Sequence, residues 1–345
     1  MNVQSAVLLP VNQFDHFYRG GDRIGALRHG PGGPRRPEEW IGSTTARYGQ
    51  APAGLTVLPD GRTLAEEVSV EPEAWLGPTH LARYGSSTEL LVKLLDLDQR
   101  LPVHLHPTRE FSRTHLGLAH GKTEAWYVLD APEGARVGVG FAQRMSIDQV
   151  RSWVMDRDSE ALLSALCTRE VRPGDAMLVP SGLPHTVQEG VFVLELQEPT
   201  DLSILLEWQG FAVDGFKDGH LDLGFDTALQ AVDTSAISDS DLDRLVLPRE
   251  GIESSGLISA LPSAADPYFR LHRLTGSSGE TVDAGFSIVL VTAGRGVLTF
   301  GDHGQEVTRG DAVVIPYAAG SWRLEGGAVA MVCRPPAADA PEAPR

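Results

Sequence analysis

One strand pattern that occurs twice in this 345-residue chain constrains its fold more than any other feature. The two copies are VRPGDAMLVPSGLPHTV (171–187) and VTRGDAVVIPYAAGSWRL (307–324). In each copy, Gly-Asp predicts a tight turn, the apolar run predicts a buried strand, and the proline ends it. We therefore predict a mostly β chain with two related barrels, one near 85–205 and one near 280–335.

Further short apolar runs with Gly and Pro between them support the same fold class, because brief, regularly punctuated strands are typical of sandwiches and barrels. The predicted strands are 124–131, 136–142, 176–180, 190–198, 286–294, 296–301 and 312–316. Apolar residues at helical spacing predict a helical segment over 146–167, with Ser146 capping its start, and a short helix over 238–247.

These patterns divide the chain into five parts. We expect an N-terminal region (1–84) that packs on a first barrel with a helical insertion (85–209). A connector (210–279), a second barrel of the jelly-roll kind (280–335) and a flexible tail (336–345) follow.

Charge and composition narrow the class of function. The chain has 29 basic and 46 acidic residues and a net charge of −17, which argues against a nucleic-acid-binding surface. Its sequence predicts neither a membrane span nor a secretory signal. Cys167 and Cys333 are too few for a disulfide framework. We expect a cytoplasmic enzyme.

The strongest chemical signal is a cluster of potential metal ligands. His104 and His106 are alternate residues of a predicted strand and so point to the same side. His185, in the first copy of the repeated pattern, has the spacing of the second cupin motif. A carboxylate, Glu110 or Glu124, would complete the set. Three imidazoles and one carboxylate suit one divalent ion: Zn²⁺ is expected, and Fe²⁺, Mn²⁺, Co²⁺ and Ni²⁺ also fit.

The second copy of the pattern serves as an internal control. It has no His-x-His strand, and counting from Pro316 puts Ser321 where the first copy has His185. Only the first barrel is therefore expected to hold metal. The remaining histidines, His16 among them, have no other potential ligand at a comparable spacing in the sequence and are assigned no ligand role.

The chain resembles the type I mannose-6-phosphate isomerases, a zinc-dependent cupin family. The resemblance covers most of the length and rests on these runs: PEEWIGS (37–43), LLVKLLDLDQRLPVHLHP (90–107), GKTEAWYVLDA (121–131), PGDAMLVPSGLPHTV (173–187) and VFVLELQEPTD (191–201). It also implies that both barrels are of the cupin type, that the first (85–209) binds the metal and that the second (280–335) is metal-free.

The resemblance assigns roles to individual residues. It selects Glu124 as the metal carboxylate, where cupin spacing alone favours Glu110. It implies Glu195 and Lys122 as catalytic residues, and Lys93 and Glu38 as substrate-binding residues. Lys93 lies within the apolar run LLVKLL, where an unpaired charge is costly, which favours a cleft or a buried ion pair.

The chain also departs from the family pattern. His104 stands where the family usually has glutamine, and a histidine can ligate the metal equally well. Pro102 replaces a substrate-contacting serine, Leu205 falls where the family has its catalytic arginine, and Arg19 replaces the tryptophan of a Trp-Gly-Gly run. Another basic residue, such as Lys217 or Arg172, would have to compensate for the arginine.

The sequence thus predicts a metal-dependent aldose–ketose isomerase that converts mannose 6-phosphate to fructose 6-phosphate by proton transfer through a cis-enediol. Because of Leu205, the alternatives are an isomerase of a non-phosphorylated or different sugar, or a non-catalytic sugar-binding cupin. An oxygen-using iron cupin is a third class. The expected partner is a sugar or sugar phosphate, with no nucleic acid or membrane, and the chain acts as a monomer or homodimer.

Overall fold

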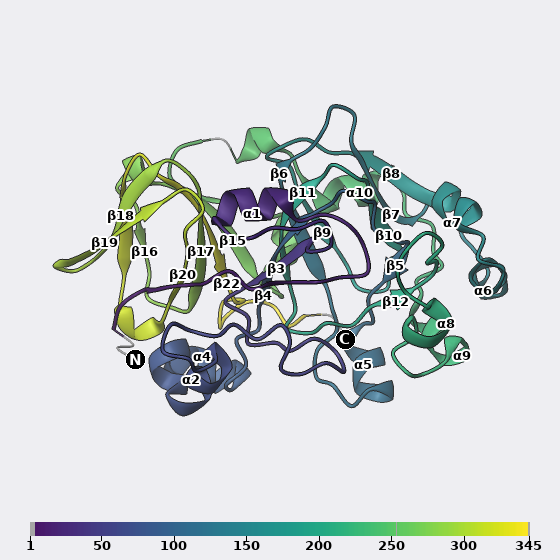
Figure 1. The fold of residues 1–345 in the computed structure, drawn as a ribbon, viewed down its shortest axis with the longest axis horizontal. Helices are drawn as coiled ribbons and strands as arrows, with labels where there is room; N and C mark the ends of the chain where they lie inside the picture. The colour runs from purple at the N-terminus through teal and green to yellow at the C-terminus, as the bar shows by residue number, and fades with distance from the viewer. Residues whose placement is uncertain (1–3, 253, 344–345) are drawn as a thin grey trace.

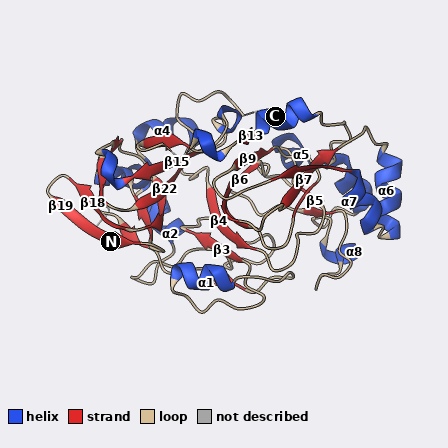
Figure 2. Cartoon of the chain, turned by 90° about the horizontal axis from the view of Figure 1, so that it is seen from above, coloured by secondary structure: helices blue, strands red, loops and turns tan. Residues whose placement is uncertain are grey.

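A computed structural model describes residues 4–252 and 254–343. Within them the chain is mostly β and forms antiparallel sheets flanked by short helices (Figures 1 and 2). The seven-stranded sheet runs β13 (Val246–Leu247), β9 (Ala176–Val179), β6 (Glu124–Asp130), β11 (Phe192–Gln197), β4 (Leu91–Asp96), β3 (Glu38–Ile41) and β2 (Gln13–Phe14). The five-stranded sheet runs β12 (Ile204–Leu205), β5 (His104–Leu105), β10 (His185–Val187), β7 (Arg136–Phe141) and β8 (Leu166–Glu170).

The seven-stranded and five-stranded sheets form the first half of the fold, and two further sheets form the second, C-terminal half. The six-stranded sheet runs β1 (Val7–Leu8), β20 (Ala312–Ile315), β17 (Ser287–Ala293), β22 (Val329–Arg334), β15 (Arg270–Thr275) and β14 (Leu257–Ser259). The four-stranded sheet runs β16 (Thr281–Val282), β21 (Trp322–Gly326), β18 (Arg295–Phe300) and β19 (His303–Thr308).

The α-helices are short, and these are their bounds: α1 (Asp22–Arg28), α2 (Leu64–Val70), α3 (Pro72–Leu76), α4 (Pro78–Tyr84), α5 (Arg109–His115), α6 (Ile147–Asp156), α7 (Ser159–Ala165), α8 (Gly215–Asp218), α9 (Phe225–Ala228) and α10 (Asp239–Leu245). The predicted helical segments are confirmed as α6 with α7 and as α10. The Ser146 side chain caps α6 by accepting a hydrogen bond from the Gln149 amide.

The repeated sequence pattern corresponds to a repeated strand order. The order β9-β6-β11-β4 in the first half matches β20-β17-β22-β15 in the second. Likewise β5-β10-β7-β8 matches β16-β21-β18-β19. The mostly β fold class and the internal repeat predicted from the sequence are therefore confirmed.

Within each half, two sheets share a hydrophobic core. Trp126 of β6 and Val193 of β11 cluster with Val139 of β7, which belongs to the five-stranded sheet. In the second half, Val289 of β17 clusters with Leu324 of β21 in the same way. Each half is thus a pair of facing sheets.

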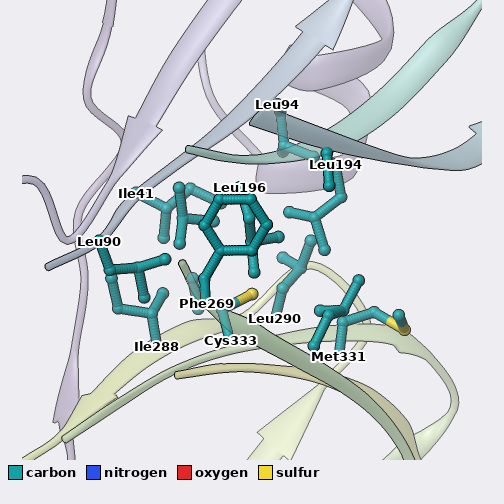
Figure 3. Packing of buried hydrophobic residues seen from close by; sticks show 14 of the residues in the cluster. Ile41, Leu90, Leu94, Leu194, Leu196, Phe269, Ile288, Leu290, Met331 and Cys333 are labelled. Atoms are coloured by element: carbon teal, nitrogen blue, oxygen red, sulfur yellow. The ribbon is translucent and has the colours of Figure 1, made fainter. Parts of the chain in front are cut away.

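A third cluster joins the two halves. Leu194 and Leu196 of β11 pack with Leu290 of β17, Met331 of β22 and Phe269 (Figure 3). The seven-stranded and six-stranded sheets therefore meet back to back, each using the face that its own sandwich leaves free.

Strand alternation decides which residues face the interior of the first half. In β11, Leu194 and Leu196 face the cluster between the halves, so Glu195 shares the opposite face with Val193. In β4, Lys93 shares a face with Leu95 of the inner core in the same way. Polar residues that look misplaced in apolar runs thus point into the first sandwich.

The N-terminal residues reach both halves. β1 pairs with β20 of the six-stranded sheet, whereas β2 and β3 extend the seven-stranded sheet next to β4. The last described residues lie against α4, where Arg83 and Tyr84 donate hydrogen bonds to the carbonyls of Ala338 and Ala337. The division into five parts remains a prediction. Among the described helices, none has the length and apolar character needed to cross a membrane.

Candidate metal centre

Three histidines meet inside the first half. His104 and His106 lie at β5, with Leu105 between them pointing outward into the cluster under α6 and α7. His185 begins β10 and is the direct antiparallel partner of His104. All three side chains are buried, and one ring nitrogen from each lies within 4.8 Å of the others.

Backbone carbonyls fix the orientation of these rings. The Nδ1 atoms of His104, His106 and His185 lie 2.8, 2.7 and 2.8 Å from the carbonyl oxygens of Pro102, Leu202 and Leu183. An Nδ1 that donates to a carbonyl carries the proton and leaves the Nε2 lone pair free for a metal. The Nε2 atom of His185 is buried without a hydrogen-bond partner. The three residues therefore fit a divalent ion.

Glu124 lies next to the triad. Its carboxylate oxygens are 2.9 Å from Nε2 of His106 and 3.3 Å from Nε2 of His185, and Trp126 Nε1 donates to it at 3.0 Å. Glu110, the alternative from the sequence, is exposed on the first turn of α5. The structure thus brings Glu124, and not Glu110, to the histidines.

Lys122 contacts both members of this group. Its Nζ lies 2.7 Å from Oε2 of Glu124 and 2.7 Å from Nε2 of His106. Burial opposes ionisation of Glu124, but the Lys122 cation and the contacts with His106 and His185 together outweigh it and hold the pKa of Glu124 well below its usual range. Burial, aided by Lys122, lowers the pKa of His106 to about 3, so this imidazole is neutral at physiological pH.

A second buried network surrounds Lys93. Its Nζ lies 3.4 Å from Glu38, 3.7 Å from Glu195 and 3.8 Å from Asp201, and 4.6 Å from the centre of the Trp40 ring. Burial by itself lowers the pKa of Lys93, but the surrounding carboxylates raise it above its usual range. The charge that the sequence places within an apolar run is therefore paired.

The pKa values of Glu38 and Glu195 are shifted in opposite directions. Burial raises the pKa of Glu38, but Lys93, His16 and the hydrogen bonds from Tyr18 and Trp40 together outweigh burial and bring it below the usual range. For Glu195, burial and the charge of Glu124 raise the pKa to about 7, although Lys122 and Lys93 oppose the change. The Oε1 atom of Glu195 is buried without a hydrogen-bond partner.

All of these groups border one cavity of about 630 Å³ or lie directly behind its wall. His104, Glu124 and Lys122 line it beside Lys93, Glu195 and Glu38. Pro102 and Leu205, two of the departures from the family pattern, also line it. The cavity is large enough for a sugar phosphate.

The structure adds residues that the sequence did not indicate. His16 lines the cavity with its Nε2 3.2 Å from Glu38, and Tyr18 donates its hydroxyl proton to the same carboxylate. Arg19, which directly precedes Gly20-Gly21, is exposed, whereas Tyr18, one residue earlier, lines the cavity. Arg47 lines the cavity from the segment after β3.

In the second copy of the repeated pattern, the structural counterpart of His185 lies one residue later than residue counting predicts. In the second half, the interior position that opens β21 is Trp322, which pairs with Val282 as His185 pairs with His104. Ser321, the counterpart expected from residue counting, is exposed. The short turn at Tyr317–Ala319 accounts for the offset.

No family model matches the chain. Among characterised proteins, it is 30% identical over 257 residues to the mannose-6-phosphate isomerase of Streptococcus mutans, which covers 72% of this chain and 75% of the relative. It is 28% identical over 266 residues to mannose-6-phosphate isomerase ManA of Bacillus subtilis, covering 75% and 80% of the two chains.

Solved structures agree with this similarity. The mannose 6-phosphate isomerase of Bacillus subtilis superimposes with a TM-score of 0.71 at 21% identity, covering 96% of this chain and 100% of that one. A mannose 6-phosphate isomerase bound with zinc and yttrium superimposes with a TM-score of 0.70 at 13% identity, covering 96% and 100%.

Proposed function

Since the chain belongs to the type I mannose-6-phosphate isomerase family, we propose that it is a metal-dependent aldose–ketose isomerase that interconverts mannose 6-phosphate and fructose 6-phosphate. In this proposal each pair of facing sheets corresponds to one cupin barrel, and the first barrel carries the active site.

One observation carries the proposal: three oriented histidines and Glu195, a buried glutamate with a raised pKa, lie at the same cavity. His104, His106, His185 and Glu124 would hold the ion, for which Zn²⁺ is the first choice because of the nitrogen-rich donor set. The ion would polarise the substrate's oxygens and stabilise negative charge.

Within this scheme the protein moves one proton. Isomerisation removes a proton from C2 of the open-chain aldose and returns one to C1 through a cis-enediol, so it needs a group that can act as base and then as acid. Glu195, with a pKa of about 7, is suited to both roles at neutral pH. Lys122 and Lys93 would stabilise the developing oxyanion, and Glu38 would hold Lys93 in place.

Isotope exchange tests the proposal directly. The zinc-loaded protein is incubated with mannose 6-phosphate, fructose 6-phosphate and the two free sugars in heavy water. Deuterium at C1 or C2 is expected in the phosphorylated pair. If no sugar exchanges hydrogen with any divalent metal, the chain is a sugar-binding protein instead, and oxygen consumption with Fe²⁺ would indicate an oxygenase.

A second candidate has its own support. Leu205 and Pro102 give part of the cavity an apolar lining that does not bind a phosphate. An isomerase of a non-phosphorylated sugar would show exchange with free mannose or fructose and none with their 6-phosphates.

A further inference from the structure

Arg47 lines the same cavity and is not used by the scheme above. We propose that Arg47 is the residue that binds the substrate's phosphate and selects phosphorylated over free sugars. This inference rests on the proposed function, because it assigns the substrate class of the same site.

Arg47 differs from the two buried lysines of the cavity in having no carboxylate partner. Lys122 contacts Glu124 at 2.7 Å, and Lys93 lies within 3.8 Å of three carboxylates. Across the described residues no carboxylate lies within 4.0 Å of the Arg47 guanidinium, and its Nε is buried without an acceptor. A buried donor without an acceptor is costly, and a ligand oxygen would relieve that cost.

The guanidinium is also held in place before any ligand binds. It lies 5.0 Å from the centre of the Phe14 ring, and the Phe14 and Trp40 rings meet edge to face with centres 5.3 Å apart. Lys93 lies over the same Trp40 ring. Two cations thus rest on one aromatic pair, Lys93 with its carboxylates and Arg47 without any.

The backbone around Arg47 is equally well defined. Its amide donates to the carbonyl of Ala53 at 2.7 Å, and the Asn12 side chain donates to the carbonyl of Gly54 at 2.8 Å. Gly54 has φ +93°, and a Cβ there would lie 2.6 Å from the Trp40 ring. The segment is therefore packed against the aromatic pair and carries Arg47 at a fixed position.

The other charges of the cavity wall do not replace Arg47. Asp218 and Asp222 line the cavity and would repel a phosphate. Arg35 also lines it, but its side chain is exposed, whereas Arg47 is half-buried. Lys217 and Arg172, the substitutes considered from the sequence, do not line it, and Arg172 is paired with Glu170. The planar guanidinium fork matches phosphate geometry, and it would have to supply the attraction.

Calorimetric titration of the zinc-loaded full chain tests the inference without relying on turnover. Arg47→Gln is expected to weaken binding of fructose 6-phosphate and of inorganic phosphate by roughly 10- to 100-fold. Binding of free fructose should change less than about twofold. Arg47→Lys, which keeps the charge but loses the fork, should recover part of the affinity.

Arg113→Gln is the matched control, because Arg113 is exposed on α5 and does not line the cavity. This variant should bind every ligand as the wild type does. The inference is overturned if Arg47→Gln weakens both sugars equally, if it changes neither, or if the wild type binds no phosphorylated ligand. Should Arg47→Gln fail to fold, an Arg47→Lys protein with unchanged phosphate affinity overturns it equally.

The two proposals can fail separately. Arg47-dependent phosphate binding without hydrogen exchange would refute the isomerase and keep the phosphate site. Exchange confined to free sugars, with no effect of Arg47→Gln, would keep the isomerase and refute the phosphate site.

Discussion

At the scale of single residues, the cavity depends on buried charges whose states are set by their neighbours. Lys93 stays charged because carboxylates surround it, and the same cation keeps Glu38 ionised. Glu195 receives less compensation, since Glu124 repels it and its Oε1 has no hydrogen-bond donor. A buried carboxyl group with so little compensation lowers the free energy of unfolding. Because its pKa lies near neutrality, it is also available for proton transfer.

Removing the proposed metal carboxylate should remove the ion. Glu124→Gln is expected to lower the bound metal to well below one ion per chain, because a neutral amide is a poor ligand beside three neutral imidazoles. Glu110→Gln, at an exposed position on α5, is the control and should retain metal. Elemental analysis after dialysis measures both, and metal lost from the Glu110 variant alone would reverse the assignment.

The raised pKa of Glu195 predicts a gain in stability when this residue cannot ionise. An unfolded glutamate titrates near pH 4.3, so between that pH and about 7 the folded protein binds the extra proton. Stability attributable to Glu195 therefore falls as the pH rises through this window, and the full penalty applies above it.

In chelator-treated protein, Glu195→Gln should accordingly raise the melting temperature at pH 8 by roughly 2–6 °C and change it little at pH 4. The same substitution should lower the isomerisation rate by about 10²–10⁴. Calorimetry and an exchange assay measure the two effects. A variant that is less stable at pH 8, or fully active, would contradict this role.

The sequence identified those site residues that lie in recognisable local motifs, such as His-x-His and Gly-Lys-Thr-Glu. They could not identify His16, Tyr18 or Arg47, whose place at the cavity depends on packing against Trp40 and Glu38 and not on local spacing. A lone histidine or arginine in a loop has no periodic pattern from which its neighbours can be read.

At the scale of elements, alternation within single strands separates core from site. β4 and β11 each turn apolar residues toward the cluster between the halves and a charged residue toward the cavity. The apolar run over 190–198 predicts β11, whereas β4 is not among the strands predicted from the sequence. The two-residue strands β5 and β12 are defined by pairing with neighbours, so their limits are visible only in the structure.

The segment that carries Arg47 offers a matched pair of glycine substitutions. Gly54→Ala would place a methyl group against Trp40, whereas a methyl group added at Gly49, which has φ +68°, would have nothing within 4 Å. Gly49→Ala should cost about 1–2 kcal/mol of unfolding free energy from backbone strain alone. Gly54→Ala should cost about 1–3 kcal/mol more, because it overpacks the aromatic pair. Unfolding in urea measures the free energy that each variant loses. Equal losses would show that the segment relaxes to accommodate the added methyl group at Gly54.

At the scale of the whole molecule, the cluster between the halves makes them dependent on each other. Phe269 lies at its centre, fully buried among residues from both halves (Figure 3). The repeat in the sequence predicted two related units. It could not predict that they meet back to back, because the outward leucines of each unit look like ordinary strand residues.

Truncating Phe269 should therefore destabilise both halves together. Phe269→Ala is expected to cost about 3–5 kcal/mol and to lower the midpoint of one shared unfolding transition. Met155→Ala, at an exposed position on α6, should change stability by less than about 0.5 kcal/mol. Two separate transitions in the wild type, only one of them shifted by the variant, would show that the halves unfold independently.

The pairing of β1 with β20 has a consequence for how the protein is made. Val7 pairs with Val314, so β1 has no partner until β20, which lies far later in the chain, has been synthesised. Until then the nascent chain exposes an open strand edge and the leucine face of β11, which are surfaces prone to aggregation. A premature stop before β20 would leave β1 unpaired and the leucine face of β11 uncovered.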